Sequence, residues 1–202
     1  MASWELEDAA SRAAANKYTF YRPRRELIAA IAPGAIVKLV FLFESDNPEN
    51  WRAERMWVSV DFVGPDGTFR GRLDNDPRYI KDLQCGDVVL FDARHIINIH
   101  GIDDRDNLIE KYIKRCYVSA RIYEDGVPVG YFYRDEPGSD EDSGWCFMGG
   151  DETENYLSDS SKLRVLSLGR LLSYDDSMIH LLASPVGSEF ELDPDSQQFR
   201  KL

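Results

Sequence analysis

The sequence lacks long apolar runs. Its longest apolar stretches span residues 28–32 and 39–43, whereas a membrane helix needs about 20 apolar residues, so no membrane-spanning segment is expected. The first 17 residues open with acids and have no basic segment followed by an apolar one, so a secretory signal is not expected either. These absences predict a cytoplasmic protein without a membrane partner.

Cysteine and histidine are scarce, with three of each. Cys85, Cys116 and Cys146 are far apart and form no Cys-x-x-Cys pair, which favours reduced thiols over a disulfide framework or a zinc site. The histidines are scattered, and no serine-nucleophile motif, metalloprotease motif or phosphate-binding glycine loop is present. We therefore expect no catalytic residues, no metal and no cofactor, and predict that the protein is not an enzyme.

One arrangement of aspartates has the spacing of a calcium loop. Asp140, Asp142 and Asp151 occupy its relative positions one, three and twelve. An EF-hand requires glycine at position six, where this chain has Trp145, so calcium binding is not expected. Cys146 is a nucleophile only if a base lies beside it, and a small apolar residue on a short strand is more often part of a core.

Basic charge is also in short supply. The chain has 24 Lys and Arg against 36 Asp and Glu, a formal net charge of −12. Residues 1–114 contain 16 basic and 19 acidic residues, a net charge of −3, whereas residues 115–202 contain 8 and 17, a net charge of −9. An acidic surface repels phosphate backbones, which argues against nucleic-acid binding, and it attracts basic proteins. The alternative is that this charge only keeps the protein in solution.

The composition supports a folded protein, with 43% hydrophobic and 12% aromatic residues in a chain of 202. We predict an α+β protein of two small domains, residues 1–106 and 107–202, each with a mostly antiparallel sheet and a few flanking helices. The boundary depends on the polar segment 103–107, which follows Gly101 and is the best linker candidate.

The first domain is expected to have a helical lead-in over residues 1–34 and a sheet over residues 35–100. Ser3 can cap a first helix whose first turn holds Glu5, Glu7 and Asp8. Pro23 suits the start of a second helix that ends at Gly34. Runs of β-branched and aromatic residues predict strands, with a Gly-Pro-Asp-Gly turn between the second and third. These strands are expected at residues 36–43, 56–63, 68–73, 88–91 and 96–99.

The second domain is expected to begin either with a short helix over residues 108–114 or with a segment there that leads directly into the second sheet. Residues 117–123 and 127–133 alternate and are separated by Glu-Asp-Gly, which predicts a hairpin. Further strands are expected at 145–148 and 163–168. Asp175 or Asp176 can cap a final helix that contains residues 178–182.

Several unusual features occur in a fixed order in the C-terminal half. They are a Gly-Tyr-Phe-Tyr-Arg segment ending at Arg134, an acidic loop ending in Asp142-Ser143-Gly144-Trp145, a Gly-Asp-Glu step at 150–152, and Ser184-Pro185-x-Gly187-Ser188 before Phe190. In these features roughly the last 90 residues, the length of one small domain, resemble immunity protein family thirty-three. The resemblance implies a protein that protects bacteria from toxins released by neighbours or by the cell itself, and a toxin as its partner.

The N-terminal half also resembles a known family. It contains Glu54-Arg55-Met56-Trp57-Val58, Gly71-x-Leu73-x-Asn75-x-Pro77 and Leu83-x-x-Gly86-Asp87-x-Val89-x-Phe91. These segments are similar to the bacterial domain of unknown function twenty-three fourteen. That family usually ends with an Asp-Trp pair, where this chain has Asn98-Ile99-His100. The resemblance implies a fold and a boundary but no particular chemistry.

Acidic residues of the C-terminal half form the candidate partner-binding surface. They precede and follow the expected strand 145–148: Asp135, Glu136, Asp140, Glu141 and Asp142 come before it, and Asp151, Glu152 and Glu154 after it. If both groups lie at one end of the sheet, they form a negative rim beside Trp145, Tyr131 or Tyr133, which suits a protein interface. Trp145 can instead be a core residue, and large aromatics on strands usually bury most of their surface. The loop can also be solvated and bind nothing. Arg134 is expected to pair with neighbouring carboxylates.

We therefore predict an immunity protein that binds and neutralises a cognate toxin by occluding it. An acidic rim speeds encounter with a basic toxin, and aromatic contacts slow dissociation. If the toxin is a nuclease, the carboxylates could imitate the phosphates of its substrate. The alternative is a cytosolic regulatory or ligand-binding protein without a toxin partner. The sequence identifies neither the toxin, nor the contact face, nor the oligomeric state.

Overall fold

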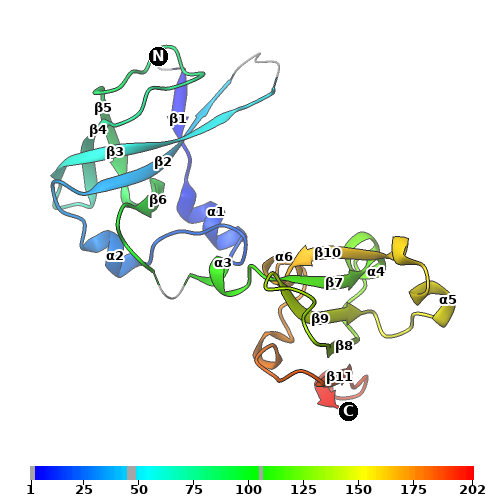
Figure 1. Cartoon of the computed structure of the whole chain (residues 1–202). Helices are drawn as coiled ribbons and strands as arrows, with labels where there is room; N and C mark the ends of the chain where they lie inside the picture. Colours follow the sequence, from blue (N-terminus) through cyan, green and yellow to red (C-terminus); the bar gives the residue numbers. More distant parts are fainter. Residues whose placement is uncertain (1–2, 45–48, 105–106) are drawn as a thin grey trace. The chain divides into compact units, whose positions relative to one another are not determined.

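The computed structural model describes residues 3–44, 49–104 and 107–202. The chain divides into two compact units, Met1–Asp106 and Asn107–Leu202, drawn in blue to green and in green to red in Figure 1. The boundary expected near residue 106, and part of the expected linker 103–107, fall outside the described residues. Just before them, Asp104 is buried and forms an ion pair with Arg24 at 3.1 Å. This contact anchors the end of the first unit to its own fold.

In the described part of the first unit, six strands form an antiparallel sheet. Their order is β1 (Trp4–Leu6), β2 (Ile36–Phe43), β3 (Ala53–Val63), β4 (Thr68–Leu73) and β5 (Val88–Asp92), while β6 (Ile96–Ile99) also pairs with β2. The predicted turn at residues 64–67 joins β3 to β4, and Gly67 there has a φ of +83°, a conformation that favours glycine. The five strands predicted for this unit are confirmed.

The sheet of the first unit buries side chains on both faces. On β2, Val37, Leu39 and Phe41 belong to the main core, whereas Val40 faces a smaller cluster on the other side. Helix α2 (Arg25–Ala29) contributes Ile28 to the main core, and helix α1 (Ala9–Ala15) contributes Ala9 to the smaller cluster. A short 3₁₀ turn, η1 (Ala93–His95), joins β5 to β6. The alternation along β2 therefore sets the position of both helices.

The helix predicted to start at Ser3 is wrong. Residues Trp4–Leu6 form β1, which pairs with the end of β2, and Trp4 and Leu6 pack against the main core. The helix α1 starts only at Ala9, and its N-cap is Asp8, whose carboxylate accepts a hydrogen bond from the Ser11 amide at 3.0 Å. The alternation of apolar and acidic side chains suits a strand with one buried face, and this burial outweighs the local capping signal.

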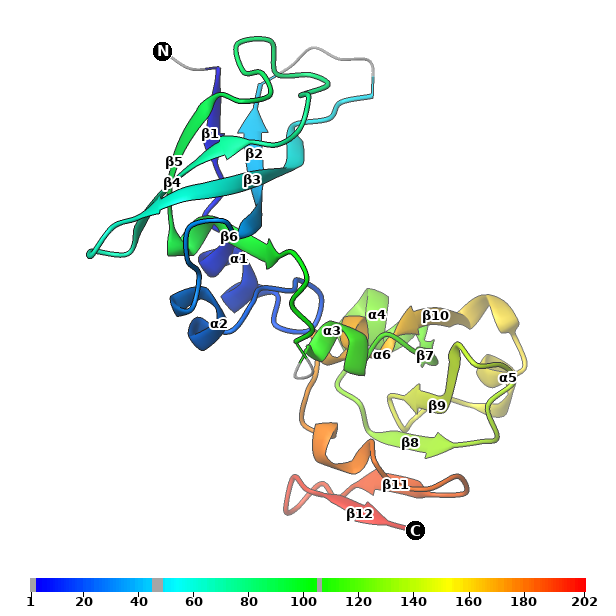
Figure 2. The same cartoon turned by 60° about the vertical axis from the view of Figure 1, so that its left-hand side comes forward.

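Within residues 107–202, a second six-stranded sheet has the order β10-β7-β9-β8-β11-β12. The strands β7 (Arg115–Ser119) and β9 (Asp142–Met148) are parallel, and the other pairs are antiparallel. The remaining strands are β8 (Tyr131–Arg134), β10 (Leu163–Ser167), β11 (Glu189–Leu192) and β12 (Phe199–Lys201). Figure 2 shows β11 and β12 next to each other at the end of the chain. Both units thus have α+β folds with mostly antiparallel sheets, as predicted.

The hairpin predicted for residues 117–133 is wrong, because β9 lies between β7 and β8. The chain leaves β7 through helix α4 (Ala120–Asp125). Ser119 caps this helix, since its hydroxyl accepts a hydrogen bond from the Arg121 amide at 3.4 Å, and Gly126 ends it in the left-handed conformation with φ +71°. The Glu-Asp-Gly segment therefore terminates a helix instead of turning a hairpin.

The helices of the second unit also differ in part from the prediction. The short helix expected after residue 107 is present as α3 (Leu108–Lys111), but residues 178–182 form only a 3₁₀ turn, η3 (Ile179–Leu181). Asp175 does not cap a helix there, because its carboxylate accepts amide hydrogen bonds from Val129 and Ser177. Helix α6 (Leu168–Leu172) was not predicted from the sequence, and the other short elements are α5 (Glu154–Leu157) and η2 (Ser160–Lys162).

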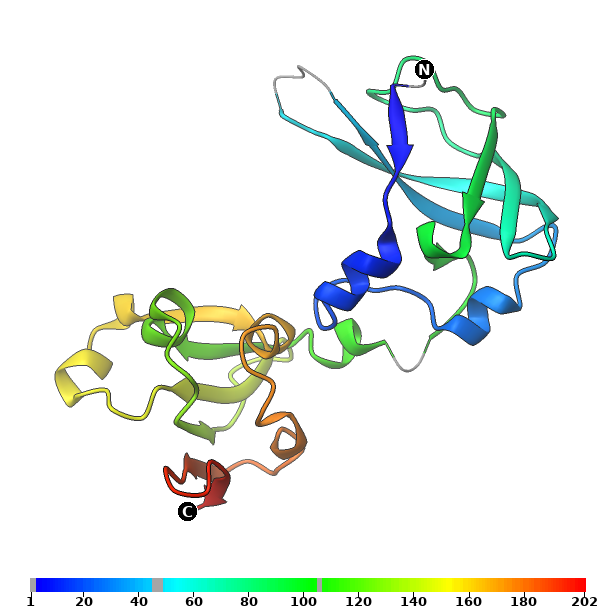
Figure 3. The same cartoon turned by 180° about the vertical axis from the view of Figure 1, so that it is seen from behind.

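Helices α4 and α6 pack against β7 and β10 on one side of the second sheet. They lie in front of these strands in Figure 3, while Figure 1 turns the opposite side of the sheet toward the viewer. We call this opposite side, which carries Tyr117, Tyr131, Tyr133, Cys146 and Val165, the open face. In the part of the chain that the structure describes, no helix is both long and apolar enough to span a bilayer.

Candidate functional site

The two acidic groups predicted to share one rim lie at opposite ends of β9. Asp135, Glu136, Asp140 and Glu141 precede this strand, Asp142 begins it, and Asp151, Glu152 and Glu154 follow it. A strand of seven residues is about 20 Å long. The expectation of a single negative rim is therefore wrong, because the strand that the sequence places between the two groups separates them in space.

Two of these carboxylates hold the local backbone. Asp142 accepts amide hydrogen bonds from Gly138 and Gly144, both at 2.9 Å, and these bonds lower the pKa of its carboxyl group. Burial raises the pKa of Glu152, but hydrogen bonds from the Gly149 amide at 2.7 Å, the Ser119 hydroxyl and the Gly150 amide at 2.8 Å together outweigh burial, so its pKa is lowered. Both groups stay ionised near neutral pH. Their first role is to fix the two loops that flank β9.

The other acidic residues are exposed and divide into paired and solvent-facing groups. Asp151 is paired with Arg121, and Glu141 lies 3.6 Å from the Arg115 guanidinium. The remaining side chains are exposed to solvent: Asp135, Glu136, Asp140 and Glu154. Exposed carboxylates contribute to the electrostatic field of this unit but little to the stability of its fold.

Trp145 is a core residue and not an interface anchor, since only 1% of its surface is exposed. Its ring lies 5.4 Å from Phe132, 6.1 Å from Phe147 and 6.4 Å from Phe190 between centroids. These aromatics face the side of the sheet away from the open face. A partner cannot reach the Trp145 ring without unfolding this core.

The expected pairing of Arg134 with carboxylates is also wrong. Its guanidinium lies over the Trp145 ring, 5.6 Å from the centroid, and donates to the carbonyl oxygens of Ser143 at 3.1 Å and Ser184 at 2.6 Å. Arg134 therefore ties β9 to the segment before β11. Carbonyl oxygens accept hydrogen bonds from a guanidinium just as carboxylate oxygens do, and sequence alone does not show which of the two Arg134 meets.

The open face instead presents a row of side chains that cross four strands. In the strand register, Val165 on β10 pairs with Tyr117 on β7, Tyr117 with Cys146 on β9, and Cys146 with Tyr133 on β8. Paired residues share a face of the sheet. Tyr117 is 45% exposed and Val165 is 53% exposed. Sequence reasoning missed both as surface residues, although the alternation of exposed and buried side chains along β7 marks Tyr117 as facing away from the core.

Hollows flank this row at both ends. One cleft of about 430 Å³ is lined by Tyr117, Val165 and residues of the loop before β9, including Glu141. It shares Arg115, Glu141 and Val165 with a larger hollow of about 620 Å³ that extends to Ile113, which is 62% exposed. The acidic loop predicted as a binding surface thus does lie beside an exposed aromatic residue, but that residue is Tyr117.

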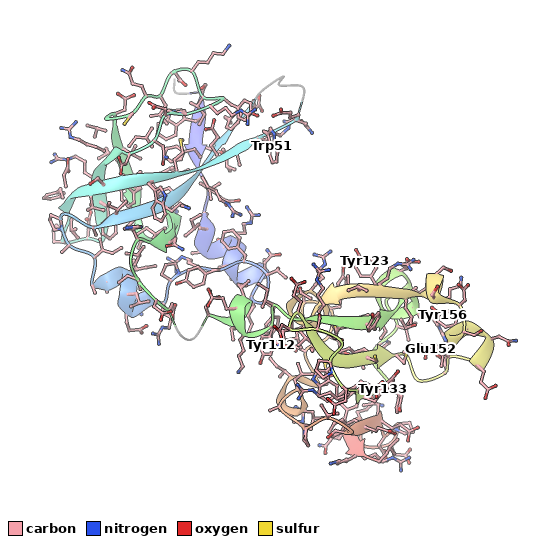
Figure 4. The ribbon with its side chains drawn as sticks, in the orientation of Figure 1. Trp51, Tyr112, Tyr123, Tyr133, Glu152 and Tyr156 are labelled. Atoms are coloured by element: carbon pink, nitrogen blue, oxygen red, sulfur yellow. The ribbon has the colours of Figure 1, made fainter. Side chains whose placement is uncertain are left out.

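A third hollow, of about 320 Å³, lies at the other end of the open face. Tyr131 and Tyr133 of β8 form part of its lining, with their ring centroids 5.8 Å apart. Glu152 from the loop after β9 contributes a carboxylate, and Figure 4 labels Tyr133 and Glu152 among the side chains of this unit. The acidic loop after β9 therefore also borders aromatic residues of the open face.

Cys146 lies between these hollows but has the properties of a packed thiol. Burial raises its pKa despite an opposing hydrogen bond from the Tyr133 hydroxyl. The thiol is therefore protonated near neutral pH and is a poor nucleophile. Among the described residues, no group of three or more His, Cys, Asp and Glu side chains could hold a metal ion. The open face offers shape, aromatic surface and charge for binding.

Comparison with known proteins identifies the family of each half. No curated protein and no solved structure matches the chain significantly. Residues 116–202, which include all five residues that define the open face, match the family described as immunity protein Imm33 domain. Residues 3–105, just over half of the chain, match the family described as an uncharacterized protein conserved in bacteria, DUF2314. The chain therefore belongs to the DUF2314 family, and residues 116–202 of its second unit match an immunity protein domain.

Proposed function

We propose that this protein is an immunity protein that binds a cognate toxin through the open face of its second unit and neutralises the toxin by occluding it. The exposure of Tyr117 and Val165 side by side on a regular sheet is the observation that carries this proposal. Exposed aromatic and aliphatic side chains that adjoin hollows are typical of interfaces that exclude water. Their position in the part of the chain that matches an immunity domain connects the surface to the function.

The charge of the second unit favours a basic toxin. Residues 115–202 contain 8 basic and 17 acidic residues. Four exposed carboxylates, those of Asp135, Glu136, Asp140 and Glu141, belong to the loop that borders the cleft beside Tyr117. These negative charges attract a cationic partner toward this edge and repel nucleic acid. The acidic loop then sets the rate of encounter, while the open face provides the contacts that slow dissociation.

The proposed mechanism is occlusion without chemistry. The protonated Cys146 thiol and the well-packed aromatic core give the open face the character of a rigid docking surface. All three cysteines are free thiols, which suits the reducing bacterial cytoplasm, where an immunity protein meets an incoming toxin. No catalytic residue, cofactor or metal enters this proposal.

Co-expression with the product of the adjacent open reading frame tests the proposal. The expected result is that this product arrests growth when it is expressed alone, that co-expression restores growth, and that the two proteins co-purify. A stable complex without any growth arrest would contradict toxin neutralisation. A failure to form any complex would favour the alternative of a regulatory or ligand-binding protein without a toxin partner.

A further inference from the structure

The lining of the hollow beside Tyr131 and Tyr133 favours a positively charged ligand. Both tyrosine rings and the aliphatic side chains of Leu157 and Leu163 form its apolar lining, and its charged lining residues are Glu152 and Glu191. Within the described residues, no basic side chain is part of this lining. A space with aromatic and aliphatic sides and only carboxylates as charged groups favours an apolar stem that ends in a cation.

The two carboxylates are fixed in different ways. Glu152 is oriented by the amides of Gly149 and Gly150, so it remains in place whether or not a ligand is present. Glu191 pairs with Arg200 at 2.6 Å, and both side chains are largely exposed. An exposed ion pair is weak, so Glu191 can exchange this guanidinium for another one at little cost. The hollow thus offers one permanent carboxylate and one exchangeable carboxylate.

The tyrosines remain neutral and keep their rings available. Burial is the main cause that raises the pKa of both Tyr131 and Tyr133. The Tyr131 hydroxyl donates to the Glu189 carboxylate at 3.4 Å, and the Tyr133 hydroxyl forms a hydrogen bond with the Cys146 side chain. With the hydroxyl groups engaged elsewhere, the two rings contribute faces and edges to the lining. A planar guanidinium stacks on such rings and can bond a carboxylate through two N–H groups, whereas an ammonium cannot do both.

We propose that this hollow accepts one arginine side chain of the protein partner. The volume of about 320 Å³ lies at the lower end of the range for ligand pockets and suits a single side chain. The methylenes of the arginine pack against Leu157 and Leu163, and its guanidinium lies between the tyrosine rings and the carboxylate of Glu152. This inference deepens the proposed function, since it assigns one arginine of the toxin to one position on the open face.

A titration that needs no toxin tests the hollow directly. The probe is N-acetylarginine amide, added to the full-length chain labelled with ¹³C in its tyrosine rings. We expect saturable shifts of the Tyr131 and Tyr133 ring resonances with a dissociation constant on the order of 1 mM. N-acetylcitrulline amide has the same shape without the charge and should bind at least about ten-fold more weakly. Equal binding of the two probes, or no saturable shift, would overturn the proposal.

Matched variants separate this site from general acidity. Glu152→Gln should weaken binding of the arginine probe at least about five-fold. Glu154→Gln, at an exposed position two residues away, should leave this binding unchanged. Because Glu152 also holds its loop, Glu191→Gln provides a second variant, with at least about a two-fold loss expected. If neither Glu152→Gln nor Glu191→Gln weakens binding of the arginine probe, the site is refuted. The titration involves no partner protein, so it can fail while a toxin complex still forms, and it can succeed where no complex is found.

Discussion

Tyr117 of β7 lies directly beside Cys146 of β9 in the parallel strand pair, with its ring on the open face. The neighbouring pair, Val118 and Phe147, points into the aromatic core and is fully buried. This single register places the packed core on one side of the sheet and the candidate binding row on the other. It also explains why the most conspicuous aromatic of the acidic segment, Trp145, is hidden while Tyr117 is exposed.

Replacing Trp145 by alanine should strongly destabilise the second unit. The substitution removes a side chain that is 1% exposed and packed among three phenylalanines, and comparable core truncations cost about 3–5 kcal/mol. The free energy of unfolding, measured by urea titration with near-ultraviolet circular dichroism, checks this expectation. As a control, Trp51→Ala changes a tryptophan that is 54% exposed and should cost less than about 1 kcal/mol. Similar costs for both variants would contradict the assignment of Trp145 to the core.

Gly126 tests the helix that replaces the predicted hairpin. Its φ of +71° favours glycine, and a Cβ added there meets no atom within 4 Å. Gly126→Ala should therefore destabilise the second unit by about 1 kcal/mol through backbone conformation alone. Gly126→Asn should cost less, because asparagine tolerates the left-handed conformation. Thermal unfolding of the two variants gives the comparison, and an alanine variant as stable as the native protein would argue against this helix end.

Acid should weaken the second unit through Asp142. Amide hydrogen bonds from Gly138 and Gly144 lower the pKa of this carboxyl group in the folded state. A lowered folded-state pKa adds stability that is present above the unfolded-state pKa of about 3.9 and disappears as the pH falls through the folded-state value. Urea unfolding at pH 7, 5, 4 and 3 should therefore show falling stability.

The matched variants for this pH dependence are Asp142→Asn and Asp140→Asn. The first should remove part of the loss of stability on acidification. The second changes an exposed carboxylate two residues away in the same loop and should leave the pH profile unchanged. Identical pH profiles for the native protein and Asp142→Asn would show that the two amide bonds do not stabilise the loop.

Much of the first unit follows from local sequence, because β2 is a nearly continuous apolar run, exposed and buried positions alternate along β4, and a Gly-Pro-Asp-Gly turn joins β3 to β4. Strand β1 does not, since its three residues form a strand only by pairing with the end of β2, more than thirty residues away along the chain. In the second unit, the segment after Ser119 contains good strand formers. Ser119 nevertheless caps a helix there and Gly126 ends it, so the chain leaves the sheet after β7, and β9 pairs with β7 instead.

The candidate site was predictable only in part for the same reason. The sequence shows acidic loops on both sides of β9, and both do border the open face. It does not show that they lie at opposite ends of that strand. The exposure of Tyr117 depends on which strands flank β7, and in this fold both neighbours, β9 and β10, are remote in sequence. Non-local strand pairing therefore decides which aromatic residues remain accessible.

Neutralising the acidic loop should slow complex formation with a basic toxin. The double variant Asp140→Asn, Glu141→Gln removes two exposed charges beside the Tyr117 cleft. Rim charges act mainly on encounter, so the association rate at low salt should fall about two- to ten-fold and the dissociation rate should change little. Surface plasmon resonance at two salt concentrations measures both rates. An unchanged association rate would place the docking edge elsewhere.

The measurement that tests the central claim most directly is a calorimetric titration of the toxin with Val165→Asp and, in parallel, with Leu90→Asp. Both substitutions place a carboxylate on an exposed aliphatic strand position, 53% exposed on the open face for Val165 and 71% exposed in the first unit for Leu90. Burying an unpaired charge in an interface is costly, so Val165→Asp should weaken binding more than about ten-fold while Leu90→Asp leaves it unchanged. Full affinity of a correctly folded Val165→Asp variant would contradict binding through the open face.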